Sequence, residues 1–265
     1  MQSIRLVRSG RLTAALLTVL ALGAVAAASA QAAPTEGPFW KVGGKRLNAN
    51  ETREVTGKVF EGTKNPLVLE AELLKVKSKV ECRLAKAAPG SFLAGGAPAT
   101  GRGVAEFSDC EVVNNGSGCK VKEPIKTEPV RTELVYNDEA KTVGEKILVE
   151  SDPEAGTEAK YVTLLFEGAK CVVKETEIGK GLALGEAFTD PTTDGGIEEP
   201  VTLKTAEQTS VLVKAPDAER SVYLLKGTTL ELVEIKPFKA FESEAKITGT
   251  VLVSLTSGEK FGVES

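Results

Sequence analysis

Four cysteines are the residues whose type and spacing point most directly to chemistry in this chain of 265 residues. Successive cysteines are separated by 27, 8 and 51 residues, and they are Cys82, Cys110, Cys119 and Cys171. Structural zinc sites use closely spaced cysteine pairs, and thiol redox sites use Cys-x-x-Cys, so neither pattern is present. An even number of widely spaced cysteines in an exported chain indicates disulfide bonds.

The stretch "CEVVNNGSGC" (110–119) is rich in turn-forming residues. If residues 114–115 form a two-residue hairpin turn, Cys110 lies directly opposite Cys119 and within bridging distance. A turn at 115–116, the stronger hairpin dipeptide, would instead place Val121 opposite Cys110. We predict a Cys110–Cys119 bridge.

By elimination, the second predicted bridge joins Cys82 to Cys171, against the two other connectivities that four cysteines allow. The longer loop should stabilise the chain more, so Cys82→Ser is expected to do more harm than Cys110→Ser.

An oxygen-rich loop provides the candidate metal site. The segment "DPTTDGGIEE" carries carboxylates around a Gly-Gly turn, at Asp190, Asp194, Glu198 and Glu199. Hard cations such as calcium prefer oxygen ligands, although the spacing is not that of an EF-hand. The alternative is a loop that is simply solvated. No other cofactor is predicted.

Absent residue types narrow the catalytic options. The chain has no histidine, which excludes Ser-His-Asp and Cys-His catalysis and imidazole zinc sites. Paired carboxylates, as in glycoside hydrolysis, are the remaining route. One tryptophan and three tyrosines leave few aromatic platforms for sugars. A non-enzymatic role is therefore favoured over an enzymatic one.

The elements that must position these residues are strands. Apolar and polar residues alternate in "KVKSKVEC" (75–82) and "KITGTVLVSL" (246–255), and turn signals recur about every ten residues. This pattern predicts an all-β fold, an antiparallel β-sandwich or barrel stapled by disulfides. The Ala-, Gly- and Pro-rich segment 85–103 is expected to be a long loop pinned by 91–93.

The segment 186–200 is the candidate domain boundary, because all four cysteines precede it. We predict a cysteine-containing β domain at 34–188 and a C-terminal β sub-region at 200–265. The alternative is that both belong to one domain.

Residues 1–33 have the order of a cleaved signal peptide. Arg5, Arg8 and Arg11 precede an apolar stretch (12–27) and small residues, with cleavage expected after Ala30 or Ala33. The apolar run is shorter than the ~20 residues of a membrane-spanning helix. We therefore predict a secreted chain without a transmembrane span, released or held at the cell envelope.

Charge argues against nucleic acid as a partner. Loss of three arginines with the signal peptide changes the formal charge from −4 to −7, and the remaining charges are interspersed. Phosphate backbones require clustered basic residues.

Four segments carry a family resemblance: "FWKVGGKRL" (39–47), "KVEC" (79–82), "EFSDC" (106–110) and "ITGTVLVSLTSGEKFGV" (247–263). Together with the signal peptide they resemble a family of exported proteins of unknown function, found as many paralogues in high-GC soil actinobacteria. The resemblance implies an all-β, cysteine-containing domain and no catalytic residues. Abundant paralogy suits surface recognition or envelope coating, by analogy only.

The sequence thus favours a secreted, non-enzymatic protein that binds an envelope or extracellular polymer or protein, or that has a structural role at the cell envelope. One alternative is an extracellular hydrolase using Asp or Glu carboxylates, with or without calcium. Another is a secreted inhibitor that presents the 85–103 segment.

Overall fold

The computed structural model describes residues 37–59, 66–73, 76–137, 140–149, 160–179, 183–192, 197–215, 220–226, 229–235, 238–240 and 243–264. The predicted signal peptide, residues 1–33, lies outside them. Every regular element in the described part is a β-strand, which confirms the all-β class. The described part contains no helix long and apolar enough to span a membrane.

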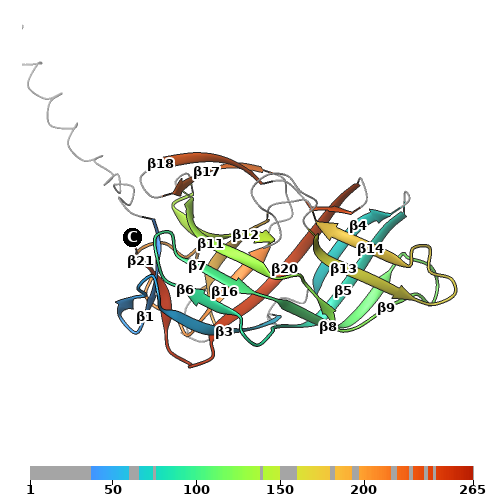
Figure 1. Ribbon diagram of the computed structural model, residues 1–265, viewed down its shortest axis with the longest axis horizontal. Helices are drawn as coiled ribbons and strands as arrows, with labels where there is room; N and C mark the ends of the chain where they lie inside the picture. Colours follow the sequence, from blue (N-terminus) through green and yellow to red (C-terminus); the bar gives the residue numbers. More distant parts are fainter. Residues whose placement is uncertain are drawn as a thin grey trace, which may run out of the picture. The chain divides into compact units, whose positions relative to one another are not determined.

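Eight antiparallel strands close into a ring, here called the first barrel (Figure 1). Each strand pairs with the next in the order β3-β6-β7-β11-β12-β15-β16-β20, and β20 pairs with β3 again. The strands are β3 (Thr52–Val59), β6 (Phe92–Ala94), β7 (Thr100–Gly103), β11 (Val130–Asn137), β12 (Thr142–Val149), β15 (Ala183–Thr189), β16 (Ser210–Ala215) and β20 (Ser243–Leu255). Of the two predicted architectures, the barrel is therefore the one that forms.

A second ring, here called the second barrel, contains the cysteines. Its order is β20-β4-β5-β8-β10-β13-β14-β19, and it returns to β20. The bridge between Thr127 and Val162 links the chain after β10 to β13. The strands other than β20 are β4 (Leu67–Leu73), β5 (Val76–Ala87), β8 (Ala105–Val113), β10 (Ile125–Lys126), β13 (Lys160–Glu167), β14 (Glu175–Gly179) and β19 (Phe238–Ala240).

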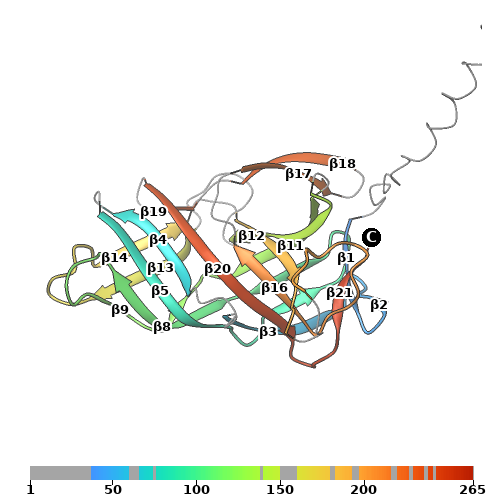
Figure 2. The ribbon, with the colours of Figure 1, turned by 180° about the vertical axis from the view of Figure 1, so that it is seen from behind.

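Strand β20 belongs to both barrels. Its residues 243–248 pair with β19 and β4, and residues 249–255 pair with β16 and β3. Figure 2 shows β20 as one long strand running past both sets of partners. The change of partners falls at Gly249, where φ is 138° and a Cβ atom would lie 3.0 Å from the Cα of Leu67. A residue without a side chain is needed for this approach.

Six further strands extend the two barrels. A small sheet combines β1 (Phe39–Val42), β2 (Lys45–Arg46) and β21 (Phe261–Glu264). The hairpin of β17 (Arg220–Lys226) and β18 (Thr229–Ile235) pairs with β11, and β9 (Lys120–Val121) pairs with β13.

Each barrel has its own apolar core. Leu134 of β11 packs in the first core, to which Trp40 and Phe261 of the small sheet contribute. Leu69 of β4 packs in the second core. Each of these four side chains is at least 94% buried, as the alternation of inward apolar and outward polar residues predicts.

The predicted boundary at 188–200 does not separate two sets of strands, because strands before it pair with strands after it. Beyond residue 200, β16 pairs with β15, β19 with β14, and β20 with β3 and β4. Residues 34–265 form one compact unit. The division into a β domain at 34–188 and a β sub-region at 200–265, with one domain as its alternative, stays a prediction.

The expectation of a long loop at 85–103 is wrong. Strand β5 continues to Ala87, and β6 and β7 are barrel strands within this segment. The small residues there serve close packing. A Cβ on Gly95 would lie 2.2 Å from the carbonyl oxygen of Asn48, and one on Gly101 would lie 2.6 Å from Oγ1 of Thr132. The predicted contact of 91–93 with the core is present, since Leu93 is buried.

The predicted cysteine connectivity is also wrong, although all four cysteines are bridged. The disulfides are Cys82–Cys110 and Cys119–Cys171. Cys82 of β5 and Cys110 of β8 are directly opposed in the ladder, with their Cα atoms 4.0 Å apart. Directly opposed cysteines on antiparallel strands lie within bridging range, but the opposed strand here comes from earlier in the chain.

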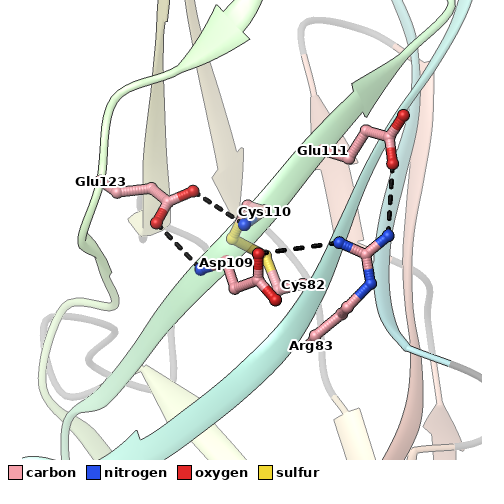
Figure 3. A network of polar contacts seen from close by, with 6 residues as sticks. All are labelled: Cys82, Arg83, Asp109, Cys110, Glu111 and Glu123. Atoms are coloured by element: carbon pink, nitrogen blue, oxygen red, sulfur yellow. Dashed lines mark hydrogen bonds and ion pairs between the residues drawn. A yellow bond between two sulfur atoms is a disulfide. The ribbon is translucent and has the colours of Figure 1, made fainter.

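Charged residues flank the Cys82–Cys110 bridge along β5 and β8, while Cys82 itself is fully buried in the second core (Figure 3). Asp109 has φ of 51°, and its N–H and that of Cys110 donate to the carboxylate of Glu123 at 2.9 and 2.7 Å. The guanidinium of Arg83 lies 3.7 Å from Asp109 and 3.4 Å from Glu111. The Glu123 carboxylate therefore satisfies two backbone donors where the strand departs from regular geometry.

The chain after β8 forms a loop instead of a tight hairpin. Asn115 is fully buried; its side chain accepts from the N–H of Val173 at 3.2 Å and donates to the carbonyl of Val173 at 3.4 Å. Together with the Cys119–Cys171 bridge, this holds the loop against residues 168–173. Asn115 begins an Asn-Gly-Ser sequon, and its burial makes it inaccessible in the folded protein.

Candidate functional site

A cleft of about 530 Å³ opens beside the end of β15, within the segment that the sequence singled out for its oxygen ligands. We call it the 189–208 cleft. Residues around it include Thr189, Asp190, Ile197, Glu199, Lys204 and Gln208. Its volume falls within the usual range for small-molecule sites, ~300–1,000 Å³.

One part of the lining, here called the hairpin wall, is formed by residues 188–190 and 197–200. A β-bridge joins Phe188 to Pro200, and the N–H of Thr189 donates to the carbonyl of Glu199 at 2.8 Å. The Thr189 hydroxyl donates to the carbonyl of Ile197 at 3.0 Å and accepts from the N–H of Glu199 at 2.9 Å. These bonds fix the wall, so the Glu199 carboxylate is carried on a well-connected backbone.

A second part of the lining, here called the turn wall, is formed by residues 202–208. The N–H of Thr202 donates to the Thr205 hydroxyl at 2.9 Å, and the N–H of Lys204 donates to the Thr202 hydroxyl at 3.3 Å. Threonine hydroxyls commonly stabilise short turns in this way. Gln208 exchanges two backbone hydrogen bonds with Phe261, which ties the turn wall to β21.

Asp190 anchors the base of the cleft. It is 1% exposed, and its Oδ1 accepts from the N–H and hydroxyl of Thr192 at 2.9 and 2.7 Å. Its Oδ2 accepts from the hydroxyl of Ser210 at 2.6 Å. A buried carboxylate needs this kind of compensation, so Asp190 acts as a support for the cleft.

Gln208 presents an unused acceptor. The residue is 9% exposed, and its Nε2 donates to the carbonyl of Ala206 at 3.0 Å. This bond orients the amide, and Oε1 has no hydrogen-bond partner within the part of the chain that the structure describes. Most of the residue is buried, but Oε1 is not among the fully buried side-chain atoms, so it is accessible from solvent and can accept from a ligand.

The four predicted calcium ligands have different surroundings. Both oxygens of Asp190 already accept hydrogen bonds, and Glu198 is paired with Lys214. Glu199 borders the cleft, and Asp194 lies outside the described residues. The residues that the structure describes include no cluster of three or more candidate ligands. Calcium binding stays a prediction.

Glu145 of β12 is a second titratable group of interest. Val143, two residues earlier on the same face of β12, belongs to the core of the first barrel. Burial raises the pKa of Glu145, and the hydroxyl of Thr132, 3.2 Å away, opposes the shift. Directly opposite Glu145 and Thr132 in the neighbouring strands are Gly185 and Gly101. A carboxyl with a raised pKa suits an acid catalyst, but its polar neighbour here is a hydroxyl.

No family model, curated protein or solved structure matches this chain. The resemblance to the actinobacterial paralogues accordingly stays a prediction.

Sequence reasoning identified the acidic residues of the hairpin wall and missed the turn wall. Lys204, Thr202 and Thr205 lie in "VTLKTAEQ", which has no recognisable motif. The spacing of Thr202 and Thr205 is compatible with a hydroxyl-stabilised turn, and this was the one available signal.

Proposed function

We propose that this protein is exported, is maintained in the oxidised form and acts as a non-enzymatic binding protein at the cell envelope. The single observation that supports a binding role is the 189–208 cleft. Its two walls are held by threonine hydroxyls, and Gln208 of the turn wall carries an amide acceptor without a partner in the described part of the chain. Preorganised polar groups of this kind lose little entropy when a ligand binds.

Export is supported by the two disulfides and by the sequence of residues 1–33. Disulfides persist in oxidising compartments. Expression in an exporting host should yield a chain that begins at Gln31 or Pro34, as read by N-terminal sequencing. A chain that keeps residues 1–33 would contradict export by cleavage.

The binding role is tested by retention of the exported chain on isolated envelope material, with and without a chelator. We expect retention, and we expect Gln208→Ala with Lys204→Ala to reduce it. The matched control is Lys160→Ala on the second barrel, whose ammonium is paired with Glu177 at 2.8 Å. Absence of retention by the unmodified chain would contradict the proposal, and loss with the chelator would support calcium.

The hydrolase alternative has one supporting feature, the raised pKa of Glu145. A carboxylate pair is required for glycoside hydrolysis. Thr132 is the polar contact of Glu145 in the described part of the chain, so binding is the better-supported proposal. The inhibitor alternative loses the free loop on which it depended, because 92–94 and 100–103 are barrel strands.

A further inference from the structure

The 189–208 cleft has charges of opposite sign on its two walls. Glu199 stands on the hairpin wall and Lys204 on the turn wall, and both are exposed. They form no ion pair with one another, and neither side chain has an ion-pair partner among the residues that the structure describes. An ammonium group would be attracted to one wall and a carboxylate to the other.

Between the charged walls, the cleft offers hydrogen bonding and limited apolar contact. Gln208 Oε1 can accept from an N–H or O–H donor, while its Nε2 is already used. Ile197 on the hairpin wall is 73% exposed, and Ala206 adds a second small apolar surface. A ligand that matches these groups carries an N–H donor between its charged ends and small apolar substituents.

We propose that the cleft binds a short peptide with free ends, in which Glu199 binds the ammonium, Lys204 binds the carboxylate and Gln208 Oε1 accepts a peptide N–H. This inference rests on the proposed binding function and names the ligand class. A cleft of about 530 Å³ accommodates two or three small residues.

The probe for this proposal is the dipeptide alanyl-alanine, and binding is followed by NMR chemical-shift changes in the purified oxidised protein. N-acetyl-alanyl-alanine and alanyl-alanine amide each lack one charged end. Because both charged side chains are exposed, removal of either charge should weaken binding by about two- to fivefold. Equal affinity for the free and both capped dipeptides would overturn the proposal.

Two variants assign each charge to its wall. Glu199→Gln should bind alanyl-alanine and its N-acetyl form equally, while still distinguishing the amide. Lys204→Met should bind alanyl-alanine and its amide equally, while still binding the N-acetyl form more weakly. Both side chains are exposed, so unfolding midpoints should stay unchanged. If Glu199→Gln still bound the N-acetyl dipeptide more weakly than the free dipeptide, the assignment of the ammonium to Glu199 would be overturned. If Lys204→Met still bound the amide more weakly, the assignment of the carboxylate to Lys204 would be overturned.

Glu177→Gln is the matched control, because Glu177 is an exposed acid paired with Lys160 on the second barrel. It should leave dipeptide binding unchanged. Envelope retention without dipeptide binding would overturn the peptide inference and leave the binding function standing. Absence of both would overturn both. If glucose, a neutral sugar, released the protein from envelope material and the dipeptide did not bind, the peptide inference would also be overturned.

Discussion

At the residue scale, Glu145 is a side chain whose charge state bears directly on stability. Burial among barrel strands raises its pKa above the value of 4.5 for a free side chain. The native state therefore holds a proton that the unfolded chain releases at a lower pH. Its favourable contribution is complete below the unfolded pKa and is lost as the pH rises through the folded pKa.

Glu145→Gln should remove this pH dependence. Relative to its effect at pH 4, the substitution should raise the free energy of unfolding at pH 7 by about 1.4 kcal/mol for each unit of pKa elevation. Urea unfolding at both pH values measures the difference. Glu54→Gln, at an exposed position on β3, is the control and should show no such change. An identical pH profile for Glu145→Gln and the unmodified protein would contradict the assignment.

Gly116 is a residue whose replacement separates local strain from packing. It has φ of 98°, and a Cβ there would lie 2.2 Å from the carbonyl oxygen of Lys170. Gly118 in the same loop has φ of 77°, but a Cβ there meets nothing within 4 Å. Both positions favour glycine by conformation, and only the first also has a clash.

Gly116→Ala should therefore destabilise the protein more than Gly118→Ala. We expect about 1 kcal/mol for Gly118→Ala from backbone strain, and ~3 kcal/mol or more for Gly116→Ala. Denaturant midpoints of the two variants give the comparison. Equal costs would indicate that the loop is not held against residue 170.

At the element scale, the disulfides join other pairs of segments than the sequence predicted. The Cys82–Cys110 bridge connects adjacent strands β5 and β8, and the Cys119–Cys171 bridge connects the loop before β9 to the loop after β13. The earlier expectation that Cys82→Ser is more harmful than Cys110→Ser assumed different bridges, and it no longer follows.

Paired removal is the appropriate test. The sequence separations are 28 and 52 residues, so on the chain-entropy model each bridge contributes about 4 kcal/mol, and the second contributes ~0.5 kcal/mol more. Cys119→Ala with Cys171→Ala should lower the unfolding free energy slightly more than Cys82→Ala with Cys110→Ala. Non-reducing peptide mapping verifies the connectivity, and a peptide linking Cys110 to Cys119 would contradict it.

At the scale of the whole molecule, β20 couples two cores that would otherwise be separate. Its first half completes the second barrel and its second half completes the first. If one half of β20 loses its partner strands, the other half is disturbed as well, because both halves belong to one continuous strand. We therefore expect residues 34–265 to unfold cooperatively.

Leu69→Ala in the second core and Leu134→Ala in the first test this coupling. Both side chains are 1% exposed, and each substitution should cost about 2–5 kcal/mol. Calorimetry should show one transition, shifted down in either variant. Two separate peaks, of which each variant moves only one, would show that the barrels unfold independently.

The sequence by itself determined the strand class, the presence of oxidised cysteines and the absence of histidine chemistry. These properties are local or compositional, because period-two alternation in 75–82 is readable without knowing any partner. The Asp190 and Glu199 region was also visible as a polar loop. The different roles of Asp190 and Glu199 were not visible, because they depend on Ser210 and on the turn wall of the cleft.

Only the tertiary structure decided which strands pair, which cysteines meet and where the cleft opens. Cys110 could face Cys119 in a local hairpin or Cys82 across a ladder, and both geometries allow a bridge. Contacts between distant segments, such as the closure of β20 onto β3 and β4, decide between such alternatives. Pairing energy depends on the neighbouring strand and on the core beneath it, and a single strand contains neither.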